Sequence, residues 1–332
     1  MNKKLKENHL LLFIKMIPDM VCEYWNFTRE TVRCNLSSSK SKQFTEILML
    51  THAIEKGFSL KNVRGDFGVA KIKNLVNLLC KYVSKYGYDD NLRVPISLIF
   101  AYQKFRENQH NLTDELENLF AKVDGIVSQY NYCKSDFVYA GTKTIMRQEM
   151  LNLGTVKFST LVHNRHSVRN FDNSKRTDTL EGKIKEAINI AKYSPSACNR
   201  QAYRVHVYKG DDKKKALTIQ GGASQFCDDA EMAIIITGDM NRYYSFEQHL
   251  LFVDSSLFAM SLLYALTAQG CANIPLTLSI KRKTLNLIKK ELDIPQNETP
   301  VIMIAVGHYA EQSKISLSER MKYTEFTTFH TK

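Results

Sequence analysis

The stretch from Arg165 to Phe171 gathers side chains that bind anions. It reads Arg-His-Ser-Val-Arg-Asn-Phe, so two guanidiniums, a hydroxyl and an imidazole lie within five residues. Arginine presents a planar fork of donors that matches phosphate, and serine adds a small neutral donor. Each charge-assisted hydrogen bond would contribute about 1.5–3 kcal/mol. The residue types and spacing predict a seat for a phosphate or another polyanion, although a short basic run is also typical of a solvated surface.

Three later segments carry further polar groups at the ends of expected elements. Residues 194–201 read Ser-Pro-Ser-Ala-Cys-Asn-Arg-Gln, residues 270–277 read Gly-Cys-Ala-Asn-Ile-Pro-Leu-Thr, and residues 318–320 read Ser-Glu-Arg. Neither a G-x-G-x-x-G fingerprint nor a G-x-x-x-x-G-K-[ST] loop occurs in the sequence. A nucleotide would therefore need another binding scheme.

The hydrophobic spacing predicts two kinds of architecture. Residues 1 to about 155 read as mostly helical, with apolar stripes at helical spacing in 44–54, 75–83, 96–105 and 112–127. Beyond 155 the pattern predicts an α+β region, in which the helix over 246–268 is apolar on nearly all sides and must be buried. The other elements expected there are helices over 178–193 and 281–292, strands over 203–208, 232–237 and 300–307, and a polar tail over 309–332.

A glycine-containing region lies between the first two helices expected from these stripes. It comprises residues 52–58, which read His-Ala-Ile-Glu-Lys-Gly-Phe, and residues 64–68, which read Arg-Gly-Asp-Phe-Gly. Glycine permits backbone angles that other residues avoid, so a compact turn is expected. A helix-capping turn with paired charges is the preferred interpretation, and a binding loop is the alternative.

Composition bounds the class of protein. The chain has 332 residues, 44% of them hydrophobic, which fits two globular domains. The net charge of +12 is evenly spread, because residues 1–155 carry 22 Lys and Arg against 16 Asp and Glu and the remainder carry 24 against 18. The seven cysteines are scattered, with no C-x-x-C pair, so neither a zinc site nor a disulfide framework is expected. We therefore expect a cytoplasmic protein with no signal peptide, no membrane span and no metal site.

The order and spacing of these segments resemble the nitroreductase-like family of FMN-dependent oxidoreductases. That family carries an R-x-S-x-R motif near the start of its domain, as at residues 165–169, and an S-P-S-x-x-N-x-Q motif after the first helix, as at 194–201. The resemblance implies a flavin fold over 156–332, with a central antiparallel-type sheet flanked by helices. An all-α domain of unknown role over 1–155 would precede it, and its 52–58 segment resembles an extension found in some bacterial relatives.

The resemblance also implies which residues hold the cofactor. In the family the first motif binds the FMN phosphate and ribityl chain, and the second motif contacts the flavin from the other subunit. A turn after the long helix lies along the flavin, and an arginine in the tail reaches the phosphate. A cation at the second arginine of the first motif would stabilise the reduced flavin. The matching residues are Arg165, His166, Ser167 and Arg169; Pro195, Ser196 and Asn199; Pro275, Leu276 and Thr277; and Arg320.

Some positions depart from the family pattern or stay without a role. Ala202 and Tyr203 stand where the family often has Pro and Trp, and Ser318 stands where it often has Lys. No catalytic residue is assigned, because the protons of the reaction can come from the flavin and solvent. His166 is expected as a ribityl contact rather than a proton donor, and Cys198 as a small buried residue rather than a redox group.

The resemblance implies a homodimeric NAD(P)H oxidoreductase that works by ping-pong hydride transfer through FMN to a small acceptor. No nucleic-acid or membrane partner is expected. Two other classes stay open. One is a flavin-binding protein without turnover, in which the helical domain closes the site or docks a partner. The other is a polyanion or nucleic-acid binder that uses residues 165–169 and the lysines at 213–215, and it predicts a colourless protein with salt-dependent binding.

Overall fold

The protein is described by a computed structural model over residues 9–30, 40–61, 63–175, 179–197, 200–243, 247 and 249–330. These residues divide into two compact units. The first takes in Val63–Gly141, the described residues before Ser59 and those from Leu317 onward, and the second takes in Thr142–Ser316 with Ser59–Asn62. The division differs from the predicted boundary at residue 155, since residues 142–155 pack with the second unit and the tail beyond 316 packs with the first.

The first unit is helical, as the apolar stripes predict. Thr113 begins the last of its helices by accepting a hydrogen bond from the amide of Leu116 at 3.4 Å, a favourable cap. The stripes form one core in which Tyr82, Tyr102 and Phe120 are almost completely buried. The helices are α1 (His9–Glu30), α2 (Lys40–Phe58), α3 (Val69–Tyr86), α4 (Arg93–Asn108) and α5 (Asp114–Gln129).

Residues 52–58 form the end of α2, so the expectation of a turn there is wrong. Gly57 allows a close approach, because a Cβ at this position would lie 1.9 Å from Cε2 of Phe67. The carboxylate of Glu55, which is 2% exposed, accepts a hydrogen bond from the amide of Gly141 at 3.3 Å. The segment therefore has a structural role within the first unit.

Residues 64–68 form the turn that precedes α3. Gly68 occupies the N-cap position with φ of 77°, in the left-handed region that glycine tolerates. The hydroxyl of Tyr102 and the guanidinium of Arg106 donate to carbonyls of this turn, at Phe67 and Gly65. These contacts favour the interpretation as a capping turn over that as a binding loop.

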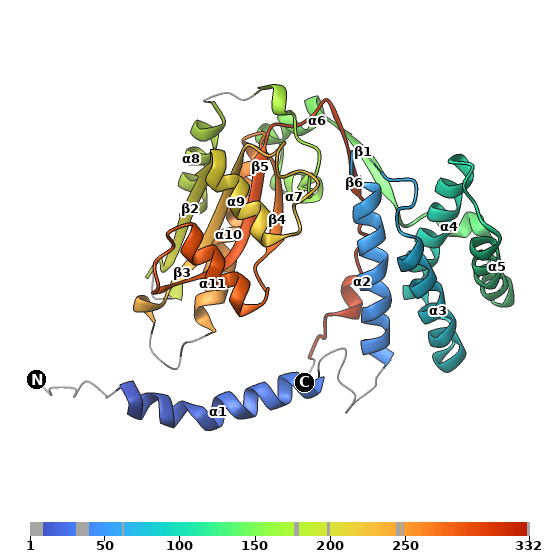
Figure 1. Cartoon of the computed structure of the whole chain (residues 1–332), viewed down its shortest axis with the longest axis horizontal. Helices are drawn as coiled ribbons and strands as arrows, with labels where there is room; N and C mark the ends of the chain where they lie inside the picture. The colour runs from blue at the N-terminus through green and yellow to red at the C-terminus, as the bar shows by residue number, and fades with distance from the viewer. Residues whose placement is uncertain are drawn as a thin grey trace, which may run out of the picture. The chain divides into compact units, whose positions relative to one another are not determined.

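The second unit is built on an antiparallel sheet of four strands in the order β2-β3-β5-β4 (Figure 1). β3 is buried along its whole length, and its alternate residues enter two different clusters. Ala233 and Ile235 pack with α9 and α11, whereas Ile234 and Ile236 pack with α8 and α10. The strands are β2 (Tyr203–Lys209), β3 (Met232–Asp239), β4 (Ala272–Thr277) and β5 (Glu298–Gly307).

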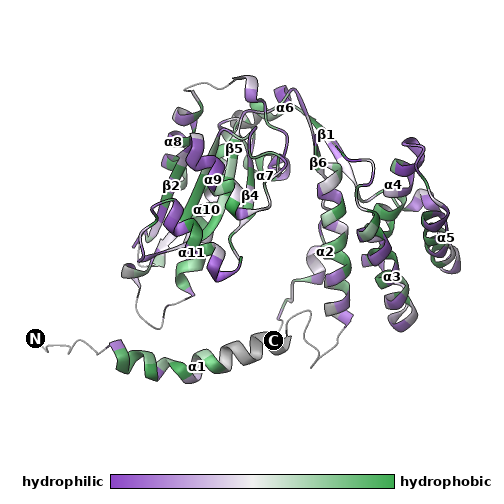
Figure 2. Ribbon diagram, viewed as in Figure 1, coloured by the Kyte–Doolittle hydropathy of each residue, from purple (hydrophilic) through white to green (hydrophobic). Residues whose placement is uncertain are grey.

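Helices therefore cover both faces of this sheet, which confirms the predicted fold class of an antiparallel sheet with helices, preceded by a helical region. Figure 2 shows the hydrophobic colouring of α10 and β5. Predicted and observed helices agree within a few residues, although residues 178, 246 and 248 lie outside the described part of the chain. The helices of the second unit are α6 (Arg147–Leu151), α7 (Phe158–Asn164), α8 (Thr179–Ala191), α9 (Gly210–Gln220), α10 (Leu250–Ala268) and α11 (Arg282–Glu291).

A separate two-stranded ribbon joins β1 (Thr142–Met146) to β6 (Gln312–Ser316). The strands are antiparallel, with Thr142 opposite Ser316. Within β6 the side chains of Ser313 and Ile315 are buried while those on either side are not, the alternation of a strand with one covered face. The ends of the long segment Thr142–Ser316 are thus held side by side where it enters and leaves the second unit.

Among the described residues, α10 is the one helix long and apolar enough to cross a membrane. Of that segment, 56% is buried inside the structure, and a core helix of a soluble protein passes the same test.

Candidate functional site

The predicted phosphate-binding stretch runs beside the outer edge of β4. Arg165 ends α7, and the chain continues until the amide of Val168 donates to the carbonyl of Asn273 in β4 at 3.0 Å. Phe171 then bridges to Tyr309, just beyond β5. Val168 and Phe171 are 0% and 2% exposed, so these apolar residues fix the stretch against the sheet. Arg165, His166 and Ser167 are half-buried beside them.

Arg169 is a buried cation. It is 8% exposed, and its Nη1 atom donates two long hydrogen bonds, to Oγ of Ser59 and to the carbonyl of Ser167, each at 3.4 Å. Burial lowers the pKa of Arg169, because the charged form loses hydration. Within the described residues no carboxylate lies in ion-pair range of this guanidinium, so its charge has no counter-charge there.

Pro275, Leu276 and Thr277 lie in strand β4, so the expectation of a turn at these residues is wrong. Pro275 is opposite Ile304 of β5, and β4 is an edge strand of the sheet. Proline has no N–H to donate, and an edge strand tolerates it for that reason. Because Val168 binds Asn273 of the same strand, the structure brings the 165–171 stretch and the 275–277 segment to one edge of the sheet.

Asn273 was not singled out by the sequence, although it is central to this edge. It is 0% exposed, and its amide donates to Oγ1 of Thr267 at 3.1 Å and to the carbonyl of Cys271 at 3.0 Å. Its side-chain oxygen is buried and has no hydrogen-bond partner among the described residues. The sequence could have indicated this residue, because Asn273 is a polar residue inside an otherwise apolar segment.

The 194–201 segment is held by Asp254 of α10. This carboxylate, 2% exposed, accepts from the amide of Ala197 at 3.2 and 3.3 Å and from the hydroxyl of Tyr243 at 3.0 Å. Ser196 accepts from the amide of Gln201 at 3.0 Å, while Pro195 is exposed. Asn199 and Cys198, which the sequence also singled out, lie outside the described residues.

A second set of contacts fixes the end of the same segment. Arg200 donates two hydrogen bonds to Glu247, at 2.8 and 3.0 Å, and its guanidinium carbon lies 5.0 Å from the ring centroid of Tyr243. Burial and the hydrogen bond to Asp254 raise the pKa of Tyr243, so the hydroxyl stays a donor. Sequence reasoning missed Asp254 and Tyr243; a lone carboxylate in an apolar helix was the signal for the first.

The two groups of predicted flavin contacts lie near opposite edges of the sheet. The 194–201 segment leads into β2 at Tyr203, whereas the 165–171 stretch follows β4. β2 and β4 are the outer strands of the order β2-β3-β5-β4. Neighbouring strands are about 4.8 Å apart, so the two edges are separated by roughly 14 Å. Arg320 belongs to the first unit, and its Nη1 donates to the carbonyl of Ser318 at 3.1 Å.

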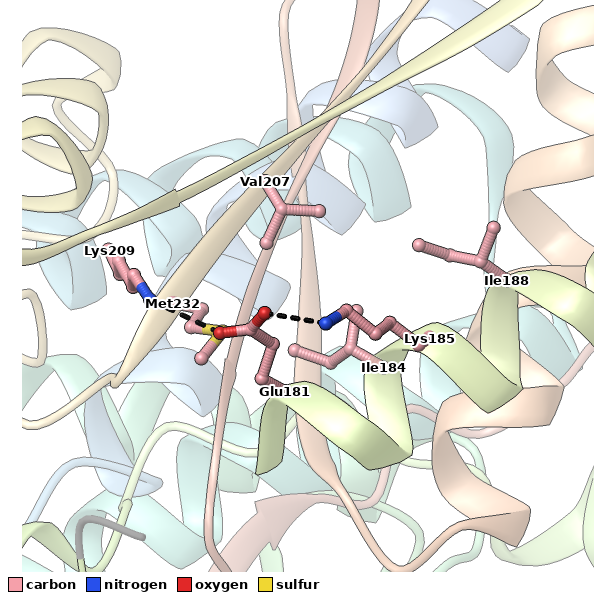
Figure 3. A pocket seen from close by; sticks show the side chains of 7 residues that line it. All are labelled: Glu181, Ile184, Lys185, Ile188, Val207, Lys209 and Met232. Atoms are coloured by element: carbon pink, nitrogen blue, oxygen red, sulfur yellow. Dashed lines mark hydrogen bonds and ion pairs between the residues drawn. The ribbon is translucent and has the colours of Figure 1, made fainter. Parts of the chain in front are cut away.

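A small pocket in the second unit lies between α8 and strands β2 and β3 (Figure 3). Its volume is about 160 Å³, and the carboxylate of Glu181 lies between Lys185 at 2.8 Å and Lys209 at 3.2 Å. None of the predicted flavin residues lines it. Drug-sized ligands occupy pockets of about 300–1,000 Å³, so this one is too small for a flavin.

Comparison with known proteins bears on the second unit. Residues 162–220 match the model of the Nitroreductase family. This range contains both the R-x-S-x-R and the S-P-S-x-x-N-x-Q segments, so the resemblance seen in the sequence is confirmed there, and it supports an oxidoreductase. No curated protein sequence matches the chain.

The chain is also similar to solved structures. An FMN-dependent nitroreductase from Clostridium difficile R20291 is 19% identical, with a TM-score of 0.43, over 52% of this chain and 98% of that one. A nitroreductase family protein from Clostridium difficile 630 is 21% identical, with a TM-score of 0.44, over 53% of this chain and 99% of that one.

Proposed function

We propose that the second unit binds FMN and that the protein is an FMN-dependent NAD(P)H oxidoreductase with a small-molecule acceptor. The single observation that carries this proposal is Arg169, a buried guanidinium without a counter-charge among the described residues, inside the matched range. When bound, FMN would supply hydride transfer between the nicotinamide and the acceptor.

The residues at the β4 edge fit such a ligand. An isolated buried charge is costly, and an anionic group beside Arg169 would offset that cost. Arg165, His166 and Ser167 supply further donors for a phosphate and ribityl chain. Pro275, Leu276 and Thr277 offer strand backbone on the same edge, so Arg169 and this strand would orient the ring system while apolar neighbours exclude water.

The visible absorption spectrum of the purified protein, with mass analysis of the chromophore released by heat, tests this. We expect FMN near one per chain in the wild type. The double variant Arg165→Ala with Arg169→Ala should be folded but free of flavin, because both cations are lost. Arg282→Ala with Lys283→Ala is the matched control, since it removes two exposed charges from α11. Full retention of flavin by the first variant would refute the site assignment.

Turnover is a separate question from binding. NADH and NADPH oxidation, followed at 1:1 FMN occupancy with a series of electron acceptors, distinguishes the enzyme from a flavin-binding protein without turnover. Oxidation of either nucleotide supports the enzyme. Bound FMN with no oxidation of either nucleotide supports the non-catalytic alternative.

A homodimer with shared flavin sites is proposed on two grounds. The two groups of predicted contacts lie near opposite edges of one sheet, so a second copy could supply the 194–201 segment to the β4 edge. In addition, α10 exposes apolar side chains that a partner could cover: Phe252, Val253, Leu257 and Met260 are 48%, 50%, 44% and 36% exposed. Sedimentation of the protein at several concentrations checks this. A flavin-loaded monomer would refute it.

Arg320 is kept as a proposed contact to the phosphate, in line with the family resemblance. Because it belongs to the first unit, Arg320→Ala is tested by itself. Reduced FMN content supports the assignment, and unchanged content removes Arg320 from the site without affecting the other residues. A cytoplasmic location is proposed on the cysteine pattern, and it is checked by fractionating cells that express the protein.

Several of the residues named for a polyanion binder are buried or paired with other groups. Arg169 and Lys213 are 8% and 5% exposed, and Lys213 donates to the carbonyl of Cys227 at 2.7 Å. Lys214 pairs with Asp228 at 2.8 Å. The residues named for that alternative therefore do not form one exposed basic patch.

A further inference from the structure

The first unit contains a pocket of about 690 Å³, and Arg320 is the one lining residue that the flavin proposal also names. Four parts of the unit line it: α2, the start of α4 with the residues just before it, Tyr139 before β1, and the tail beyond Leu317. Its volume is within the range of about 300–1,000 Å³ typical of small-molecule sites. The pocket belongs to the first unit alone, and its lining residues from Phe44 to Tyr139 come from the 1–155 region, for which the sequence suggested no role.

Three aromatic rings are part of its wall. Phe44 comes from α2, Tyr139 from the segment before β1, and Phe326 from the tail, so three distant parts of the sequence each supply a ring. Leu48 and Val94 add aliphatic surface. Rings prefer to pack against other rings in offset or edge-to-face arrangements, and a wall of this kind favours a flat, aromatic ligand.

Arg93 supplies the most defined polar group of the pocket. Its guanidinium carbon lies 5.6 Å from the ring centroid of Tyr132 and 5.5 Å from that of Tyr139, and its Nη1 donates to the hydroxyl of Tyr139 at 3.4 Å. Among the described residues Arg93 forms one ion pair, with Asp90, and the distance from Nε of Arg93 to Oδ1 of Asp90 is 3.8 Å. Nε itself is buried and has no hydrogen-bond partner among those residues. The cation is thus fixed in place by rings and only loosely neutralised.

The charges around the pocket limit the charge of its ligand. Three cations and three carboxylates line it: Arg93, Arg320 and Lys322, and Asp90, Glu319 and Glu325. Equal numbers give no strong positive field, so a multiply charged phosphate gains little from this site. A single negative charge that reaches a fixed guanidinium gains a charge-assisted hydrogen bond.

We propose that this pocket binds a planar aromatic monoanion, with its rings between Phe44, Tyr139 and Phe326 and its carboxylate or sulfonate at Arg93. The proposal does not depend on the flavin site, with which it shares one named residue, Arg320.

Two fluorescent probes with the same rings test the proposal on the full-length protein. One is 1-anilinonaphthalene-8-sulfonate, and the other is N-phenyl-1-naphthylamine, which lacks the sulfonate. Fluorescence titrations give a dissociation constant for each. In the wild type we expect saturable binding of the sulfonate probe. In Arg93→Met the dissociation constant of the sulfonate probe should rise about tenfold or more, because one charge-assisted hydrogen bond is lost. The dissociation constant of the neutral probe should change less than about twofold.

Matched variants locate the binding and guard against misfolding. Arg64→Met removes one exposed arginine of the same unit and should leave the dissociation constants of both probes unchanged. Val94→Trp should weaken both probes, because its larger ring fills the pocket. If Arg93→Met does not fold, Arg93→Lys replaces it. Lysine keeps the charge but lacks the planar fork of donors, so we expect weaker binding of the sulfonate probe and unchanged binding of the neutral probe. Melting temperature is recorded for each variant.

Three results would overturn the proposal. The first is a sulfonate probe that binds the wild type no more tightly than about 1 mM. The second is an equal effect of Arg93→Met and Arg64→Met on that probe, which would indicate binding to exposed apolar surface elsewhere. The third is an equal loss of both probes in a folded Arg93→Met or Arg93→Lys variant, which would mean that the anion is not recognised. FMN content, measured on the same samples, reports separately on the flavin proposal.

Discussion

The contact of Asp254 with the 194–201 segment can be tested by Asp254→Asn, a change of similar shape that removes the charge. In the wild type the carboxylate accepts from Ala197 with both oxygens, at 3.2 and 3.3 Å, and from Tyr243 at 3.0 Å. The carboxylate thus accepts from two donors, since the single N–H of Ala197 is shared between both oxygens; an amide has one acceptor oxygen, so one donor loses its acceptor and faces the NH₂ group.

The magnitude follows from the burial of the site. A hydrogen bond to a charged group contributes about 1.5–3 kcal/mol, and a neutral one about 0.5–1.5 kcal/mol. Replacing two charged bonds by one neutral bond therefore lowers the free energy of unfolding by roughly 2 kcal/mol or more. For a unit of 150–250 residues that corresponds to a fall of about 4–8 °C in Tm.

Circular dichroism melts and FMN titration of the flavin-free protein give the two readouts. We expect the fall in Tm together with an FMN affinity about tenfold weaker, because the 194–201 segment would no longer be fixed. Glu186→Gln, an exposed acidic residue in the second half of α8, is the matched control and should change neither quantity. An Asp254→Asn protein that melts within about 1 °C of the wild type and binds FMN equally well would show that Asp254 does not hold this segment.

Three further outcomes are expected. Gly57→Ala should destabilise the first unit by about 1–3 kcal/mol in urea unfolding, because its Cβ would meet the ring of Phe67 at 1.9 Å; an unchanged midpoint would mean that the ring moves aside freely. Asp89 should support the first unit at neutral pH and not in acid. Burial alone would raise its pKa, but hydrogen bonds from Lys40 and from a tyrosine hydroxyl leave that pKa below the ordinary value. The contribution of Asp89 to the free energy of unfolding is therefore full above the unfolded pKa of about 3.9 and is lost as the pH falls through the folded pKa. Asp89→Asn should thus lower the free energy of unfolding at pH 7 and have little effect on it at pH 2. Equal effects at both pH values would contradict this. Cys271 should resist iodoacetamide at pH 8 in the folded protein, because burial raises its pKa to about 12; peptide mapping that finds it labelled before unfolding would contradict this.

The helices of the first unit could be predicted because their apolar residues recur at helical spacing. The stripe at Leu75, Val76, Leu79 and Val83 lies on the buried face of α3, and all four residues are at most 9% exposed. The same reasoning found β3, whose run of apolar residues is buried on both faces. Local periodicity carries this information, and no long-range contact is needed to use it.

Other features depend on pairings that no local pattern reveals. The family resemblance implied a turn at 275–277, whereas these residues lie in β4, an edge strand that accepts a proline. β6 lies in a polar tail whose alternation is short, and its partner β1 is more than 160 residues away in the sequence. The role of Asp254 depends on Ala197, which is far from it in the chain. Contacts of this kind are set by the tertiary fold.

The way the chain enters and leaves the second unit has a consequence during translation. The helices of the first unit precede Thr142, but part of its pocket wall comes from residues after Ser316. At about 5–20 residues per second, the ribosome needs roughly 9–35 s to synthesise the stretch between them. The second unit can therefore fold while the first is still incomplete. A ribosome that stalls late in the message would release a chain with a finished sheet and an aromatic pocket still open on one side.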